Sequence, residues 1–378
     1  MSPRPTFDPG FSTEALTLLY TPEATVAAIL EFEAALARSL ATAGLAPAEE
    51  ADRVAEACRQ GISNAADVLD TTWEEGTPIM ALRHAVTAQI GDDAASRWFH
   101  FGATTQDAVD TAQMIQAKRA LEVIEEELVG LARGLNDLTV RHGEQPQMAR
   151  TFLQDARPAT FGFRTASWLD PVLGHVEETR RRRDGLPVQL GGPVGTMSEY
   201  GEAAQEVRAA LSRDLALGVP SISWHSDRSP ILSLARYAES CAVTMSKIAT
   251  DIALLASSAI AEVTVRSGRS SSMPHKQNPI DSIRAVAAAR ACSGAVAMLL
   301  GGPAELDRGL GSWHVEWIAL PLALQSCGAT IEAVAAAIGS LEVSEEVMRA
   351  NAGGDLEDLS AVKSQIAAVT ARFDQVVT

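Results

Sequence analysis

The most constraining feature of this sequence is an apolar seam through residues 121–138. Leucine and isoleucine recur there at alternating spacings of three and four, at Leu121, Ile124, Leu128, Leu131, Leu135 and Leu138. Such spacing places the side chains on one stripe of an α-helix, where they need other helices to cover them. We therefore predict a long helix that starts after Asp107, ends at His142-Gly143 and packs inside a bundle.

Helical periodicity extends over most of the chain. Near the N-terminus, Thr21 is a suitable N-cap, Pro22 occupies the first helical position and Gly44 stops the helix. Further helical tracts are predicted at 159–184, 230–265, 280–300 and 314–340. The best short candidate for a strand is "GLPVQLGGPVGT" (185–196). The sequence therefore predicts an all-α fold built as a long-helix bundle.

Three regions are expected along the chain. An N-terminal helical domain covers 1–103, a central long-helix domain covers 104–342, and a C-terminal helical stub covers 343–378. The stub contains one amphipathic helix, with Leu359, Val362, Ile366 and Val369 on one side. The segment 250–263 is apolar on more than one face, and a helix buried all round needs neighbours that one chain does not supply. We therefore expect a homo-oligomer.

Composition limits the partners and the compartment. The 378 residues carry a net charge of −17, which argues against nucleic acid and anionic membranes as partners. No run of 18 apolar residues and no signal-peptide pattern occurs, so a cytoplasmic protein is expected. Four dispersed cysteines in apolar surroundings are interpreted as small core residues. The predicted 159–184 helix ends with Arg180 to Arg183, whose positive charges complement the dipole at a helix C-terminus.

Familiar cofactor devices do not occur in the sequence. There is no phosphate-binding loop, no convincing dinucleotide fingerprint and no HExxH, and the histidines lack ligand spacing, so we expect no metal and no cofactor. Three polar breaks interrupt the helical pattern, at 100–111, 149–162 and 268–279. Helix ends present unpaired N–H groups that suit carboxylates, so these breaks are candidates for one shared site.

The third break carries a specific resemblance. "GRSSSMPHKQNP" (268–279) is similar to the G-S-S-x-M-P-x-K-x-N-P signature of the fumarase/aspartase superfamily, and "GATTQD" and "RTFLQDARPATFG" resemble two further regions of that superfamily. Within it, the chain is most similar to the 3-carboxy-cis,cis-muconate cycloisomerase family. The stretches "TFGFRTASWLD", "QLGGPVGTM" and "RGLGSWHVEW" support this, and the similarity runs from about residue 10 to about residue 352.

The resemblance implies a homotetramer whose active sites are shared between chains. Its members form or break a bond from carbon to a heteroatom, β to a carboxylate, through an aci-carboxylate intermediate. Lys276 and Asn278 match the groups that hold this dianion. Ser270 aligns with the serine that transfers the α-proton, acting as an alkoxide stabilised by N–H groups and Lys276. His100 either hydrogen-bonds a substrate carboxylate, tunes Lys276 or caps a helix.

The same resemblance assigns the substrate-binding positions. They are Thr104, Thr105, Gln154, Ser271, Met273, Asn278 and Arg269. The implied partner is a small polycarboxylate.

Two positions depart from the family pattern. Arg269 replaces a glycine, and either stiffens the loop or adds a charge facing the substrate. Phe152 stands where many members have a histidine that acts as general acid, and cycloisomerases usually have tryptophan there. Phenylalanine cannot protonate an amine leaving group, whereas a carboxylate or another stable anion needs no protonation.

Three functions remain open at this point. The first is cycloisomerisation of 3-carboxy-cis,cis-muconate to 4-carboxymuconolactone in aromatic-acid degradation through protocatechuate. The second is a superfamily lyase that releases a stable anion such as nitrite, or an amine, from a substituted succinate to give fumarate. The third is a non-catalytic oligomeric scaffold, which the intact Ser270, Lys276 and Asn278 speak against.

Overall fold

The computed structural model describes residues 10–268, 273, 276–300, 304–353 and 358–377. Helices account for most of these residues. They are α1 (Glu14–Leu19), α2 (Pro22–Thr42), α3 (Ala48–Gln60), α4 (Ala65–Asp70), α5 (Thr72–Glu75), α6 (Ile79–Ile90), α7 (Asp93–Ser96), α8 (Thr105–Arg141), α9 (Phe161–Asp184), η2 (Ser198–Ala203), α10 (Ala204–Leu215), α11 (Ser229–Leu255), α12 (Ile280–Leu299), α13 (Ser312–Gly339), α14 (Glu345–Ala352) and α15 (Ser360–Val377).

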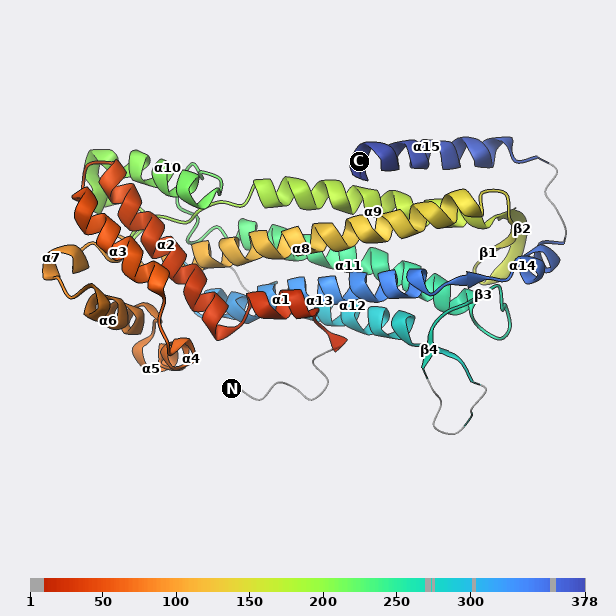
Figure 1. Ribbon diagram of the computed structural model, residues 1–378, viewed down its shortest axis with the longest axis horizontal. Helices are drawn as coiled ribbons and strands as arrows, with labels where there is room; N and C mark the ends of the chain where they lie inside the picture. Colours follow the sequence, from red (N-terminus) through yellow and green to blue (C-terminus); the bar gives the residue numbers. More distant parts are fainter. Residues whose placement is uncertain (1–9, 269–272, 274–275, 301–303, 354–357, 378) are drawn as a thin grey trace.

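Five long helices form the body of the molecule. The helices α8, α9, α11, α12 and α13 lie side by side and alternate in direction along the long axis (Figure 1). Helix α2 and the short helices α3 to α7 gather at one end, where α10 also packs against α2. The C-terminal α15 lies along α9 and α8. This arrangement confirms the predicted all-α long-helix bundle.

Local sequence explains where the helices begin. The Thr21 hydroxyl accepts a hydrogen bond from the Ala24 backbone N–H at 3.2 Å, and Pro22 is the first residue of α2. A reciprocal capping box starts α8, with Thr104 as N-cap and Asp107 at the third position. Helix α8 ends at Arg141, as the seam predicted. The last turn of α9 holds Arg181, Arg182 and Arg183, as expected of a helix C-terminus.

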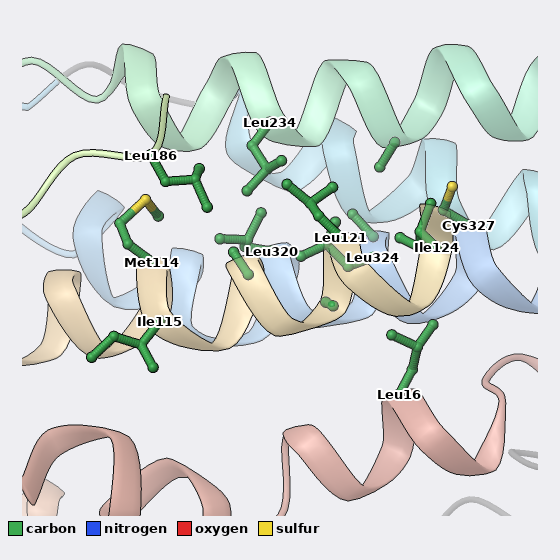
Figure 2. Close-up of a cluster of buried hydrophobic side chains, with 14 of the residues drawn as sticks. Leu16, Met114, Ile115, Leu121, Ile124, Leu186, Leu234, Leu320, Leu324 and Cys327 are labelled. Atoms are coloured by element: carbon green, nitrogen blue, oxygen red, sulfur yellow. The ribbon is translucent and has the colours of Figure 1, made fainter. Parts of the chain in front are cut away.

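The seam of α8 forms the centre of the core. Leu121, Ile124, Leu128, Leu131 and Leu135 are almost completely buried. Figure 2 shows Leu121 and Ile124 of α8 close to Leu320, Leu324 and Cys327 of α13. Leu16 of α1 points toward the same cluster. All four cysteines are buried and form no disulfide. Burial of each of these leucines stabilises the folded chain by about 1.5–3 kcal/mol.

Two helices have the length and composition of membrane spans. In the most apolar windows of α12 and α13, 44% and 67% of residues are buried within the chain. Both helices pack against each other and against α11. This is the behaviour of core helices in a bundle.

Two sequence expectations differ from the structure, and a third region has a structure that was not predicted. The strand expected at 185–196 is wrong: only an isolated bridge from Pro187 to Gly218 forms there, because the segment bonds to buried side chains instead of to another strand. The tract 230–265 stops being helical at Leu255, followed by turns and the two-residue strand β3 (Val263–Thr264). The polar break at 149–162 contains an antiparallel hairpin of β1 (Pro146–Thr151) and β2 (Gln154–Thr160).

The remaining strands are very short. β3 pairs with β6 (Glu342–Val343), and β4 (Ser267–Gly268) pairs with β5 (Asn278–Pro279). The second pair closes the base of the 268–279 segment. Both pairs lie at the end of the bundle that also carries the β1–β2 hairpin (Figure 1).

Candidate active site

The N-terminus of α8 holds three of the expected site residues together. His100, Thr104 and Thr105 lie within six residues of chain, just before and at the first turn of α8. We call these three the α8-start group. Unpaired backbone N–H groups at a helix N-terminus favour carboxylates. The Thr105 hydroxyl is hydrogen-bonded to the Thr77 hydroxyl at 2.7 Å, which fixes its side chain.

Asp107 organises the backbone around this group. Its carboxylate is completely buried and accepts hydrogen bonds from the backbone N–H groups of Gly191 at 2.8 Å, Gly192 at 2.9 Å and Thr104 at 3.0 Å. His225 Nε2 lies 2.7 Å from the same carboxylate. Asp107 therefore ties the "QLGGPVGTM" stretch to the start of α8, which explains why 185–196 forms no strand.

His100 is held by a buried carboxylate that the sequence did not single out. Glu33 of α2 is completely buried, and its two oxygens lie 2.6 Å from His100 Nδ1 and 3.0 Å from the His100 backbone nitrogen. His100 has φ +59°, an uncommon value for a residue other than glycine, so the contacts to Glu33 offset a strained conformation. Burial lowers the pKa of His100, but Glu33 outweighs burial and the net pKa is raised.

A cation also reaches this group. Arg308 donates to the Thr104 hydroxyl at 3.1 Å and to the Pro193 carbonyl at 2.9 Å. A guanidinium beside a helix N-terminus and a histidine of raised pKa makes this corner suitable for anions. Arg308 is the first residue of the "RGLGSWHVEW" stretch, and no sequence motif singled it out as a site residue.

A close backbone approach shapes the same corner. Gly102 has φ +69°, and a Cβ at this position would lie 2.5 Å from Cε1 of the Tyr200 ring. The Tyr200 hydroxyl donates to the Phe101 carbonyl at 3.0 Å. Any side chain at position 102 would therefore clash with Tyr200, so only glycine fits there.

The other described candidates lie at the opposite end of the bundle. Gln154 begins β2 directly after the hairpin tip, where Phe152 is 99% exposed and both Phe152 and Leu153 have positive φ. The Gln154 side chain is exposed and, among the residues that the structure describes, bonds only to the Leu153 carbonyl at 3.3 Å. A large apolar side chain that is fully exposed at a strained tip suits contact with another chain.

Lys276, Met273 and Asn278 belong to the same end. Lys276 is exposed and its backbone N–H donates to the Met273 carbonyl at 3.1 Å, while Asn278 pairs with Gly268 in the short β4–β5 ladder. Ser270, Ser271 and Arg269 lie outside the described residues, so their predicted roles are untested.

The two ends are separated by the whole length of α8. Its 37 residues run from Thr105 to Arg141. At ~1.5 Å per residue this corresponds to about 55 Å. The α8-start group therefore does not meet Gln154, Lys276 or Asn278 within one chain (Figure 1).

Two side chains of the "WHVEW" segment (313–317) have a structural role. Trp313 Nε1 donates to Asp110 at 2.8 Å, and Glu316 pairs with Arg228, which also binds Asp110 at 2.8 Å. These groups are buried, so they fasten α13 and α11 to α8. Among the described residues, no cluster of three or more His, Cys, Asp or Glu side chains could hold a metal ion.

Known proteins resemble this chain over nearly all its length. The 3-carboxy-cis,cis-muconate cycloisomerase of Pseudomonas aeruginosa is 36% identical over 358 residues, covering 92% of this chain and 77% of that protein. Nitrosuccinate lyase of Streptomyces davaonensis is 33% identical over 359 residues, covering 91% of this chain and 75% of that protein.

A solved structure and a family model agree with these relatives. The crystal structure of the 3-carboxy-cis,cis-muconate lactonizing enzyme from Pseudomonas putida superimposes with a TM-score of 0.86 at 31% identity, covering 98% of this chain and 86% of that one. The family model described as lyase matches residues 11–293. The chain therefore belongs to this lyase family, the fumarase/aspartase superfamily, and resembles its 3-carboxy-cis,cis-muconate cycloisomerases.

Proposed function

We propose that this protein is a cycloisomerase that converts 3-carboxy-cis,cis-muconate to 4-carboxymuconolactone. The observation that carries the proposal is the likeness to cycloisomerases over 92% of the chain, together with the anion-binding corner at the start of α8. A substrate with three carboxylates needs several cations and N–H donors placed in advance. Arg308, His100 and the first turn of α8 supply such groups in one place.

In the proposed reaction one substrate carboxylate attacks the alkene. The new C–O bond forms as the alkene electron pair moves onto the α-carbon, where a neighbouring carboxylate stabilises it as an aci-carboxylate. Lys276 and Asn278 hold this dianion, and Ser270 gives the proton to the α-carbon. This leaves Ser270 as an alkoxide, which takes a proton back from water, so that the substrate trianion and one proton give the dianionic lactone. No general acid is needed at Phe152, because the carboxylate forms a bond and does not leave.

We further propose that a homotetramer assembles the complete site. The separation of the α8-start group from Gln154, Lys276 and Asn278 supports this, since one chain cannot bring them together. Exposed apolar side chains on the bundle offer a surface for partners. They are Val243 and Leu254 on α11, Ile280, Ile283 and Met298 on α12, and Val315 and Ile318 on α13.

The three regions 1–103, 104–342 and 343–378 have corresponding proposed roles. Residues 1–103 and the start of 104–342 carry the α8-start group, and the rest of 104–342 carries the remaining site residues. Residues 343–378 pack over α8 and α9. We place the enzyme in the cytoplasm, in a protocatechuate route of aromatic degradation, which fits the tricarboxylate substrate.

The test is ultraviolet absorbance of 3-carboxy-cis,cis-muconate mixed with purified protein, with the product identified by proton NMR. Rapid loss of the diene band and appearance of the lactone, both abolished in Ser270→Ala, are expected. A folded protein that leaves the diene band unchanged contradicts the proposal. Ser270→Ala retaining normal turnover would instead remove this serine from the proton transfer.

A second candidate function is release of a stable anion from a substituted succinate. It is favoured by the 33% identity to nitrosuccinate lyase and by Phe152, which cannot protonate a leaving group. Nitrosuccinate supplied in place of the muconate distinguishes the two. Formation of fumarate and nitrite without any diene turnover would replace the first proposal with this one.

A further inference from the structure

A completely buried carboxylate lies at the hairpin end of the bundle, and the proposed reaction does not use it. Glu262 immediately precedes β3, and its side chain is 0% exposed. Its Oε1 accepts hydrogen bonds from Arg150 Nη2 at 2.8 Å and from Asn351 Nδ2 at 3.0 Å. Its Oε2 accepts one from Gln147 Nε2 at 2.8 Å. Three donors from different directions therefore surround one buried charge.

These contacts join the hairpin to the body of the molecule. Gln147 and Arg150 belong to β1, whereas Asn351 belongs to α14. The Glu262 backbone N–H donates to the carbonyl of Leu255, the last residue of α11, at 3.0 Å. The carboxylate is thus held by the bundle and in turn holds β1.

Stability alone is a weak explanation for this network. A buried ion pair adds little net stability, because the loss of hydration offsets the attraction between the charges. A carboxylate whose two oxygens are bound from three directions does, however, restrict the geometry of its partners. We therefore ask what the fixed orientation of β1 achieves.

Arg150 extends the network towards the hairpin tip. Its side chain is 15% exposed, and its Nε lies 3.0 Å from the carboxylate of Asp155 on β2. The register of the hairpin shifts between Ala149 and Arg150, just where this contact forms. A β-bulge interrupts the ladder of backbone hydrogen bonds, so the ladder by itself leaves the tip less firmly held. Arg150 bridges the bulge from buried Glu262 to Asp155.

The next residue towards the tip is Gln154, which is a predicted substrate-binding residue. Its side chain is exposed and, within the described part of the chain, bonds only to the Leu153 carbonyl at 3.3 Å. Its direction is therefore set by the backbone of the tip, which Asp155 adjoins.

We propose that Glu262 and Arg150 are positioning residues, which through Asp155 hold the hairpin tip so that Gln154 is presented to a substrate carboxylate. The proposal rests on the proposed function, because it gives the orientation of Gln154 a purpose only if Gln154 binds substrate. It adds two residues to that function, and neither of them touches the substrate.

Arg150→Lys tests this link by kinetics. Lysine keeps the charge, but its single ammonium lacks the fork that reaches Glu262 and Asp155 together. We expect KM for 3-carboxy-cis,cis-muconate to rise about tenfold, the equivalent of one hydrogen bond to a charged group, and kcat to change by less than about twofold. Arg157→Lys, at an exposed position of β2 opposite Ala149, is the matched control and should leave KM unchanged. An unchanged KM in Arg150→Lys, or a fall in kcat alone, overturns the proposal.

A double-mutant cycle shows whether Arg150 acts through Gln154. Gln154→Ala removes the side chain that Arg150 is proposed to position. Arg150→Lys added to Gln154→Ala should therefore raise KM by less than about twofold. If Arg150→Lys raised KM equally with and without Gln154, it would act by another route and the proposed link would be wrong.

Hydrogen–deuterium exchange followed by mass spectrometry gives a readout that needs no turnover. We expect peptides that cover 146–160 to exchange several times faster in Arg150→Lys and in Glu262→Gln than in the native protein, with peptides of α8 unchanged. Arg157→Lys should exchange like the native protein. Equal exchange of the hairpin in native protein and Arg150→Lys would show that the network does not hold the tip.

Two further checks keep the outcomes separate. Circular dichroism melting detects whether Glu262→Gln folds, and if it does not, Arg150→Lys still supplies the test because it leaves the buried carboxylate in place. A native protein that leaves the diene band unchanged contradicts the proposed function, whereas the exchange experiment still decides whether Glu262 and Arg150 fix the hairpin.

Discussion

At the scale of single residues, the start of α8 depends on two buried carboxylates, Asp107 in its own first turn and Glu33 on α2. Asp107 fixes the backbone of Thr104 and of the 191–192 segment, and Glu33 fixes His100. Neither was identified from the sequence as a site residue. The contact of Asp107 to Thr104 is a local capping box, but its contacts to Gly191 and Gly192 and the contact of Glu33 to His100 are long-range. Glu33 and His100 are 67 positions apart, and no local pattern connects them. Thr104 and Thr105, by contrast, were indicated by the family resemblance.

Replacement of Asp107 tests its organising role. Asp107→Asn keeps the size but removes one acceptor oxygen, so at least one buried N–H loses its partner. We expect the free energy of unfolding to fall by about 2–4 kcal/mol in urea titrations and turnover to drop with it. Asp137→Asn, on the exposed side of the same helix, is the control. Equal stability of the two variants would show that the Asp107 contacts are dispensable.

Replacement of Glu33 tests the charge on His100. Glu33 raises the pKa of His100 against the lowering effect of burial, so Glu33→Gln should lower this pKa. In the native protein the raised pKa contributes stability below the ordinary histidine pKa of about 6.5, and this contribution is lost as pH rises through the folded-state pKa. In the variant, the KM for the tricarboxylate should begin to rise at a lower pH.

The measurement is KM against pH between 5.5 and 9 for native protein, Glu33→Gln and the control Glu31→Gln. Glu31 is a partly exposed neighbour that pairs with Arg119. A rise in KM at the same pH in all three proteins would mean that the imidazolium does not contribute to substrate binding.

At the scale of elements, the long helices were predictable and the short ones were not. The 3-4 seam of α8 predicted which side chains are buried, and the cap at Thr21 predicted the start of α2. The start of α8 was predicted too late, after Asp107, because the helix begins at Thr105 with Thr104 as its cap. The segment 185–196 alternates like a strand, but its backbone N–H groups bond to Asp107. The β1–β2 hairpin has no turn signal, since Phe152 and Leu153 adopt positive φ without glycine or asparagine. In the 185–196 segment, contacts with a distant residue therefore override the local pattern.

Helix α8 carries one feature that should make its packing depend on pH. Burial, with a smaller contribution from Glu332, raises the pKa of Glu127 to about 8. One of its carboxylate oxygens is buried without a partner among the described residues. The folded state therefore binds this proton between about pH 4.5 and 8, and stability falls as pH rises through that window.

We expect Glu127→Gln to stabilise the protein by about 1–3 kcal/mol at pH 8 and by much less at pH 5. Thermal or urea unfolding at both pH values measures the difference. Glu122→Gln, at an exposed position of the same helix, should be neutral at both. A stability gain that does not change with pH would show that Glu127 does not titrate in this range.

At the scale of the whole molecule, our proposal is that the single chain is incomplete as an enzyme. Its candidate groups lie at opposite ends of a helix of 37 residues, and the bundle exposes apolar side chains on α11, α12 and α13. The sequence anticipated partners from the apolar 250–263 segment, although that segment turned out not to be one helix. The family resemblance, rather than periodicity, supplied the idea of shared sites.

Disruption of this apolar surface tests the assembly. Ile283→Arg on α12 places a charge on an exposed apolar position, so it should leave the folded chain intact but dissociate the oligomer. We expect a smaller species in size-exclusion chromatography with light scattering and almost complete loss of turnover. Leu18→Arg, at an exposed position of α1, serves as a control. A fully active Ile283→Arg monomer would refute shared sites.

The most direct measurement of the central claim is turnover of 3-carboxy-cis,cis-muconate by mixed oligomers. Thr105→Val and Ser270→Ala chains, each inactive alone, are unfolded, mixed in equal amounts and refolded together. If different chains supply these residues, about a quarter of the sites regain both, and activity returns to that extent. Mixing His100→Ala with Thr105→Val, which lie together in one chain, should restore nothing. No recovery in the first mixture, from refolded oligomers of native size, would contradict the account.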